Sequence, residues 1–139
     1  MLFYQVYDDF YAVAARAREI GAKERLFLLC DAYRDEGIMR RVREAFGSVC
    51  DSGDAALAAR VREEAGDAAF VAIGSANYER LRAQGAEPVC VLYEGQRAPA
   101  GAEDRVIALP LLKKAETVAQ LVVDTIRRES GPEHDIRIF

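Results

Sequence analysis

Four short and almost unbroken apolar runs, separated by segments with helical periodicity, dominate the middle of this 139-residue chain. A strand with one solvated face alternates polar and apolar residues, whereas unbroken apolar runs are typical of parallel strands covered on both faces. The alternation therefore predicts an α/β domain with a parallel sheet between two layers of helices. The four runs are Leu26 to Cys30, Ala69 to Ile73, Val89 to Tyr93 and Val106 to Leu109.

Helix start and stop signals lie between these runs. Asp8 or Asp9 can cap a first helix, which Gly21 ends, and Ser75 can cap a later one. The predicted helices are Asp9 to Gly21, Tyr33 to Phe46, Ala55 to Glu64, Ser75 to Gln84 and Glu116 to Arg128. The face of the last helix predicted to point inward consists of Val118, Leu121, Val122 and Thr125.

Two connections carry weaker signals. Ser48 to Cys50 is too short to predict more than a weak second strand, and Glu94 to Asp104 is rich in turn residues and predicts a loop. With the weak strand included, we predict a three-layer, doubly wound domain of five mainly parallel strands in the order 2-1-3-4-5, preceded by an extra N-terminal helix.

Length and composition favour one compact domain. The chain is 51% hydrophobic, enough for a full core in 139 residues. We expect one domain over 1–139, with an N-terminal extension and helix at 1–22, a core at 23–129 and a tail at 130–139.

Charge and hydropathy exclude two classes of partner. The net charge is -4 and basic residues are interleaved with acidic ones, so nucleic acid is not an expected partner. No run approaches the roughly 20 apolar residues of a membrane span, and Met1 to Tyr7 lacks the features of a signal peptide. We therefore expect a cytoplasmic protein that does not contact a membrane.

The three cysteines are expected to be reduced, because an odd number cannot close into a full set of disulfides. Cys30-Asp31 and Cys50-Asp51 follow neighbouring strands, and thiolate with carboxylate can hold zinc. The favoured interpretation is that the thiols are small buried hydrophobes and that the chain has no metal site.

The span from Phe27 to Gly74, FLLCDAYRDEGIMRRVREAFGSVCDSGDAALAARVREEAGDAAFVAIG, resembles the first half of a response-regulator receiver domain. The segments PVCVLY and VIALPLLKKAETVAQLVVDTIRR are similar to the fourth strand, fifth strand and closing helix of that family. The resemblance covers roughly three-quarters of the chain and implies a flavodoxin-like or receiver-like fold.

Carried over position by position, the resemblance argues against the chemistry of the family. The acidic pair falls on Cys30 and Asp31, and the phosphoacceptor position falls on Ala72. The switch hydroxyl falls on Tyr93 and the lysine on Leu109. A single carboxylate holds Mg²⁺ poorly. The resemblance therefore implies a phosphorylation-independent domain used for protein contact, with no catalytic residue and no cofactor.

A competing hypothesis is a small-ligand-binding or enzymatic domain that takes a nucleotide or another anionic ligand. Open α/β sheets bind ligands at the carboxyl ends of their strands, and the turn at Gly74 offers a helix N-terminus to an anion. The chain has no P-loop and no G-x-G-x-x-G motif. Candidate ligand-binding residues at this edge are Asp31, Asp51, Gly74, Ser75 and Glu94.

Both chain ends have the pattern of short apolar strands, Met1 to Tyr7 and Asp135 to Phe139. Short isolated strands are marginally stable and tend to pair. We predict a homodimer, or pairing of the tail within the chain, through Ile136 and Ile138. An untethered chain end is the alternative.

Overall fold

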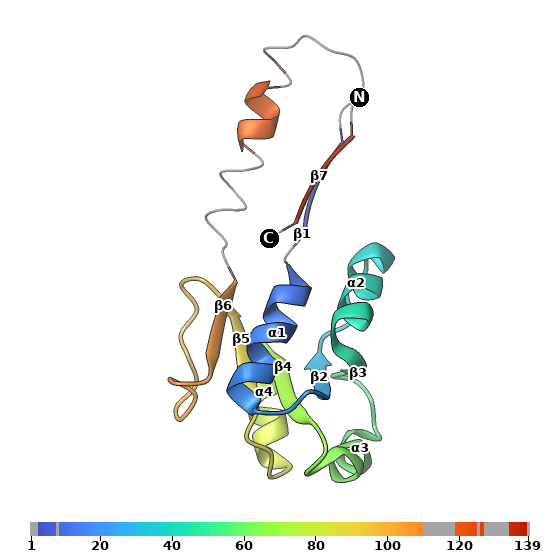
Figure 1. Ribbon diagram of the computed structural model, residues 1–139, viewed down its shortest axis with the longest axis vertical. Helices are drawn as coiled ribbons and strands as arrows, with labels where there is room; N and C mark the ends of the chain where they lie inside the picture. Colours follow the sequence, from blue (N-terminus) through green and yellow to red (C-terminus); the bar gives the residue numbers. More distant parts are fainter. Residues whose placement is uncertain (1–2, 8, 110–118, 125, 127–133, 139) are drawn as a thin grey trace.

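A computed structural model describes residues 3–7, 9–109, 119–124, 126 and 134–138. Its main sheet has five strands, all parallel, in the order β3-β2-β4-β5-β6 (Figure 1). Counted from β2, this is the predicted order 2-1-3-4-5, so the flavodoxin-like α/β architecture is confirmed. The strands are β2 (Leu26–Cys30), β3 (Gly47–Asp51), β4 (Ala69–Ile73), β5 (Val89–Tyr93) and β6 (Val106–Leu109).

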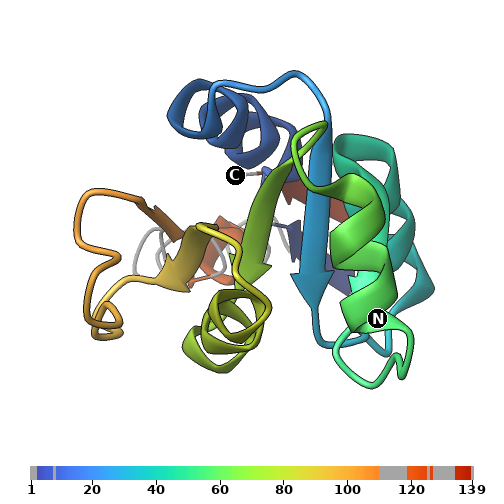
Figure 2. The same ribbon diagram turned by 90° about the horizontal axis from the view of Figure 1, so that it is seen from below.

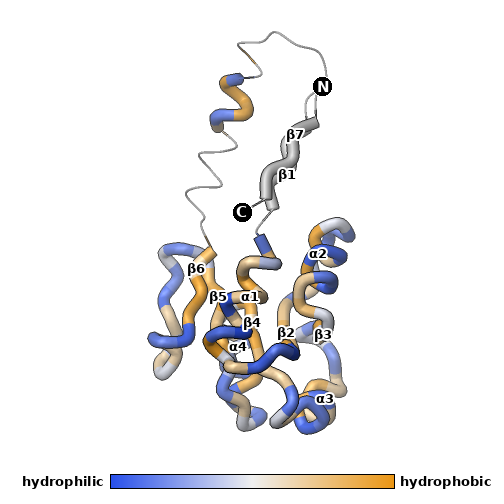
Figure 3. The backbone as a smooth tube through the Cα atoms, viewed as in Figure 1, coloured by the Kyte–Doolittle hydropathy of each residue, from blue (hydrophilic) through white to orange (hydrophobic). Residues whose placement is uncertain are grey.

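Helices cover both faces of the sheet, which completes the three predicted layers. One face is covered by α1 (Phe10–Gly21) and α2 (Glu36–Phe46), which between them contact all five strands. The other face is covered by α3 (Leu57–Glu64) and α4 (Ser75–Ala83) (Figure 2). The strands of the main sheet are largely apolar (Figure 3). With the helices they form two cores, one on each side of the sheet.

The helix starts follow the local hydrogen bonds of their caps. The Asp9 carboxylate accepts from the Ala12 N–H at 3.0 Å, so α1 begins where the sequence predicted. The prediction for Ser75 is wrong, because Gly74 occupies the cap position with φ of 94° and no side chain caps α4. The helix α3 begins at Leu57 rather than Ala55, since the chain from Ser52 to Ala56 forms turns after β3.

The strand β3, which the sequence predicted only as a weak strand over Ser48 to Cys50, is longer and more fully paired than expected. It spans Gly47–Asp51 and pairs with the whole length of β2, from Leu26 opposite Gly47 to Cys30 opposite Asp51. Glycine and serine have low strand propensity, but pairing with a buried neighbour and burial of Cys50 outweigh that preference.

The inward face predicted for the last helix is wrong at Val122. Residues 119–124 and 126 are helical, and Leu121 is buried, but Val122 is 43% exposed. The predicted positions Val118 and Thr125 lie outside the described residues. The physical reason is that α1 and α2 already cover one face of the sheet, and the helical segment lies beyond the carboxyl ends of the strands (Figure 1).

The two chain ends meet in a separate two-stranded parallel sheet of β1 (Phe3–Tyr7) and β7 (His134–Ile138). In its register, Gln5 lies opposite Ile136 and Tyr7 opposite Ile138. Pairing within the chain is thus one of the two outcomes predicted for the ends, and the homodimer stays a prediction. Among the described helices, none has the length and apolar character needed to cross a membrane.

Candidate functional site

The order of the sheet reverses between β2 and β4, which makes their carboxyl ends the switch point where doubly wound domains bind ligands. All five predicted ligand residues lie at the carboxyl edge. Asp31 follows β2, Asp51 ends β3, and Gly74 and Ser75 follow β4. Glu94 follows β5 and is exposed.

At the switch point, Asp31 is the centre of a polar cluster. The Asn77 amide donates to Asp31 Oδ1 at 3.4 Å. Hydrogen bonds from the Ser52 hydroxyl and from Asn77, together with the charge of Arg80, lower the pKa of Asp31 below its usual range. Asp31 is therefore a carboxylate at neutral pH. Arg80 also donates to the Ser52 carbonyl at 2.8 Å, which joins α4 to the turn after β3.

The turn after β3 has a local structural explanation. Asp51 Oδ1 accepts from the Gly53 N–H at 2.8 Å and lies 3.4 Å from the Ser52 hydroxyl. That hydroxyl also hydrogen-bonds to Asp31, and its single proton serves one carboxylate at a time. Ser52 thus lies between the two predicted carboxylates and donates to one of them at a time, while Asp51 mainly holds its own turn.

Asn77 is the buried polar residue of this cluster. It is only 2% exposed, and its amide nitrogen also donates to the Ile73 carbonyl at 3.0 Å, which fixes the orientation of the amide. Its Oδ1 has no hydrogen-bond partner among the described residues. Sequence reasoning missed Asn77, Ser52 and Arg80. The usable signal was an asparagine in the first turn of a helix, where its poor helix propensity needs a reason.

Of the five positions that the receiver resemblance assigns to phosphotransfer, Asp31 is exposed and Tyr93 is partly exposed. The other three hold buried side chains without oxygen. Ala72 is 0% exposed within β4, and Leu109 at the end of β6 is buried. Cys30, at the position of the first acidic residue, is buried in the core under α1 and α2. None of these three side chains has an oxygen that could accept phosphate or hold Mg²⁺.

The cysteines do not form a shared site. Cys30 belongs to the core under α1 and α2, whereas Cys50 belongs to the core on the opposite face of the sheet. Burial raises the pKa of Cys30 to about 12 and that of Cys90 to about 11, so both are protonated thiols. Within the described part of the chain, no group of three or more potential ligands is placed to hold a metal ion.

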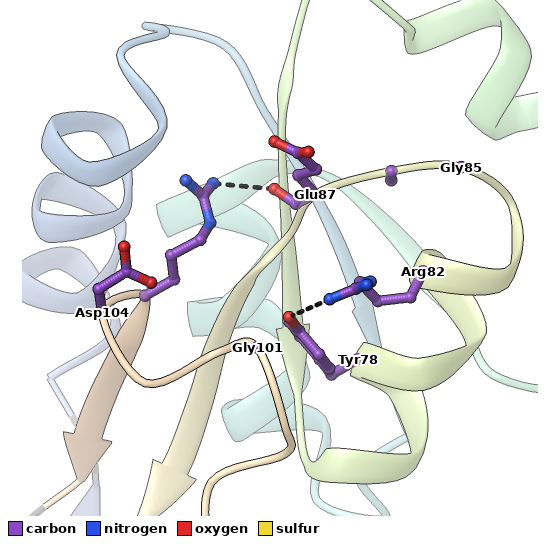
Figure 4. A pocket seen from close by; sticks show the side chains of 8 residues that line it. Tyr78, Arg82, Gly85, Glu87, Gly101 and Asp104 are labelled. Atoms are coloured by element: carbon purple, nitrogen blue, oxygen red, sulfur yellow. Dashed lines mark hydrogen bonds between the residues drawn. The ribbon is translucent and has the colours of Figure 1, made fainter.

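One cavity reaches the carboxyl end of β2, where Cys30 and Ala32 line it, and a second lies at the other edge of the sheet. The first, of about 470 Å³, runs along the outer edge of β3 between α2 and α3, and Asp51 lines it. The second, of about 460 Å³, lies at the opposite, amino-terminal edge of the sheet (Figure 4). Gly74, Ser75 and Glu94 line neither of these two cavities.

Comparison of the chain with known protein families, with curated proteins and with solved structures found no match.

Proposed function

We propose that this chain is a phosphorylation-independent, receiver-like regulatory domain that acts through protein contact. The observation that carries the proposal is the burial of apolar side chains at the phosphotransfer positions, Ala72 and Leu109 above all. A fold that keeps the sheet but has buried apolar side chains at the phosphoacceptor and lysine positions cannot accept phosphate there, and its surface is then what other molecules can recognise.

An exposed apolar face on the last helix is the proposed contact surface. Val122, Val123 and Ile126 are exposed, and their spacing places them on one side of the helix. A closing helix would normally pack on the sheet face that α1 and α2 already cover. The apolar face of the last helix therefore has no place in the core on that side. We propose a second copy of the chain as the partner, with the pair β1 and β7, including Ile136 and Ile138, joining the interface.

Phosphodonor treatment tests the first part of the proposal. The protein is incubated with acetyl phosphate and Mg²⁺ and its intact mass is measured, beside a receiver domain that has its phosphoacceptor aspartate. We expect an adduct on the control domain alone. A stoichiometric, acid-labile adduct on this chain would refute the proposal.

Light scattering tests the dimer. The full chain is compared with a version ending at Glu129 and with Ile126→Asp, which places a charge on the exposed apolar face. Gln120→Lys on the same helix is the matched control, since Gln120 is exposed and contacts Asp124 away from that face. We expect a dimer for the full chain and control and monomers for the other two. A monomeric full chain contradicts the dimer.

The second candidate function is binding of a small ligand at the switch point, and the observation that favours it is the unpartnered Oδ1 of buried Asn77. The neighbouring Asp31 carboxylate suits a hydroxyl or amine of the ligand. The uncapped N-terminus of α4 suits its anionic part. The test is whether denatured, freshly purified protein releases a nucleotide detectable by ultraviolet absorbance and mass, and whether Asp31→Asn loses it.

A further inference from the structure

The cavity at the amino-terminal edge of the sheet brings together two arginines from segments distant in sequence (Figure 4). Arg82 comes from the last turn of α4, and Arg105 from the residue before β6. The wall between them is the turn Gly85 to Glu87, which precedes β5, and the loop around Gly101. This site is at the opposite edge of the sheet from Asp31, and it is independent of the proposed function.

Arg105 is held in a fixed orientation by neutral groups. Its Nη2 donates to the Glu87 carbonyl at 2.8 Å, and its Nε donates to the Pro88 carbonyl at 3.3 Å. These two bonds clamp one side of the guanidinium and leave the hydrogens of Nη1 without a partner among the described residues. The clamp reduces the conformational entropy that Arg105 would lose on binding a ligand.

Arg82 is held by the buried ring of Tyr78. Its Nη1 donates to the Tyr78 hydroxyl at 3.2 Å, and its guanidinium carbon lies 5.9 Å from the centre of that ring. The hydroxyl accepts this bond and donates none to the described residues, so its own proton is available to a ligand. Tyr78 is thereby a third donor on the wall of the cavity.

Neither arginine forms an ion pair with the described part of the chain. Glu87 and Asp104 also line the cavity, but Arg105 contacts the backbone carbonyl of Glu87 rather than its carboxylate. In Figure 4 the Glu87 carboxylate points away from Arg82. The two negative charges of Glu87 and Asp104 equal the two positive charges of Arg82 and Arg105. The net charge of the lining is thus zero, and the choice between anions depends on where the hydrogen-bond donors point.

Gly101 leaves the space that Arg82 uses. Its φ is +87°, and a Cβ placed there would lie 3.0 Å from Arg82 Nη1. A side chain at this position would be strained and would push the guanidinium aside.

We propose that this cavity binds a tetrahedral oxyanion, either inorganic phosphate or the phosphate group of a small molecule. The two guanidiniums approach from different walls and Tyr78 adds a hydroxyl donor, an arrangement that suits oxygens pointing in several directions more than a planar carboxylate. The cavity volume of about 460 Å³ leaves room beside the phosphate for a small organic group.

Calorimetric titration of the full chain with inorganic phosphate tests the site, with acetate as the planar anion for comparison. We expect phosphate to bind more tightly than acetate. Arg82→Gln and Arg105→Gln should each weaken phosphate binding about tenfold or more, because each loses a charged hydrogen-bond donor. Arg62→Gln, on the exposed surface of α3, is the matched control and should bind like the parent chain.

Three further variants separate binding from folding. Arg82→Lys keeps the charge but loses the guanidinium fork, and Gly101→Ala displaces that fork, so both should weaken binding while circular dichroism stays unchanged. Glu87→Gln removes a nearby negative charge and should tighten binding. Undetectable binding at about 10 mM phosphate, or an unchanged affinity in either Arg82 variant, would overturn the proposal. Titration of a methyl phosphate ester beside phosphate distinguishes a free ion from a phosphorylated small molecule.

Discussion

Gly21→Ala is expected to destabilise the fold, because the end of α1 lies directly against the start of β4. A Cβ built on Gly21 would lie 2.5 Å from the Cβ of Ala69, and both atoms are fixed by the backbone. Overpacking of this kind costs about 1–3 kcal/mol. The gain in helix propensity from glycine to alanine returns at most about 1 kcal/mol. Because a Cβ–Cβ approach of 2.5 Å is far inside van der Waals contact, we take the upper part of that cost, about 2–3 kcal/mol, and expect a net loss of about 1–2 kcal/mol in the free energy of unfolding.

Urea unfolding followed by circular dichroism measures this loss. With a slope of about 2 kcal/mol per molar urea, the midpoint should fall by about 0.5–1 M. Gly53→Ala is the control, since its added Cβ meets only Asp51 Oδ1 at an ordinary 3.6 Å. Ala69→Gly in the Gly21→Ala background removes the opposing methyl, and the two changes should compensate each other. Additive effects, or a Gly21→Ala chain as stable as the parent, would refute the placement of α1 on β4.

Three further predictions concern the buried cysteines, the Asp31 carboxylate and the buried position Ala72. In the native protein at pH 8, Cys30 and Cys90 should react very slowly with a thiol reagent and quickly in urea, because burial holds their pKa values at about 12 and 11; rapid native labelling of Cys30 would contradict this. The lowered pKa of Asp31 means that its carboxylate stabilises the fold above its unfolded pKa of about 4, and that this contribution is lost as the pH falls through the lower folded value. The stability difference between the parent and Asp31→Asn should thus be largest near neutral pH and shrink in acid. Urea midpoints of the two proteins that differ by the same amount at neutral and at acid pH would contradict this prediction. Ala72→Asp should lower stability by about 3 kcal/mol or more and gain no phosphate from acetyl phosphate, since the carboxylate would be fully buried; a stable, phosphorylated variant would reverse the interpretation of this position.

Three of the four strands that the sequence predicted well, β2, β4 and β5, are buried on both faces, whereas β6 was predicted from its unbroken apolar run although it lies at an edge and is partly exposed. Every residue of β2 is buried, and its unbroken apolar run follows directly from that burial. The strand β3 lies at an edge and is partly exposed, and its sequence has no apolar run that would predict a strand. Its existence depends on hydrogen bonds to β2, which no local pattern contains. The prediction that Val122 points into the core was wrong for a related reason. Helical periodicity defines the apolar face of a helix, but it does not show which part of the protein covers that face.

The candidate sites divide in the same way. Asp31 was predictable because a rule of topology places residues after a strand at the carboxyl edge. Its partner Asn77 is 46 residues away in the chain, and their contact follows from the packing of α4 on β4 and β2. The arginine pair at the opposite edge was missed, because that rule says nothing about the amino-terminal ends of strands and because Arg82 and Arg105 contact neutral groups rather than acidic residues.

The unpartnered oxygen of Asn77 separates two interpretations of the switch-point cluster. A purely structural network would be expected to satisfy its buried acceptors, since leaving one unpaired costs about 1–3 kcal/mol. Glu64 Oε2 is the other buried, unpartnered oxygen in the described residues, but Glu64 already forms an ion pair through Oε1 with Arg25 at 2.6 Å. Asn77 uses both of its N–H groups and has no such compensation for its oxygen. Natural sequences keep local costs of this kind mainly where function requires them, so the proposal of a ligand at this edge predicts that the ligand donates a hydrogen bond to Asn77 Oδ1. A network that only supports the fold predicts instead that Asn77→Ala lowers stability, because both hydrogen bonds from the amide are lost.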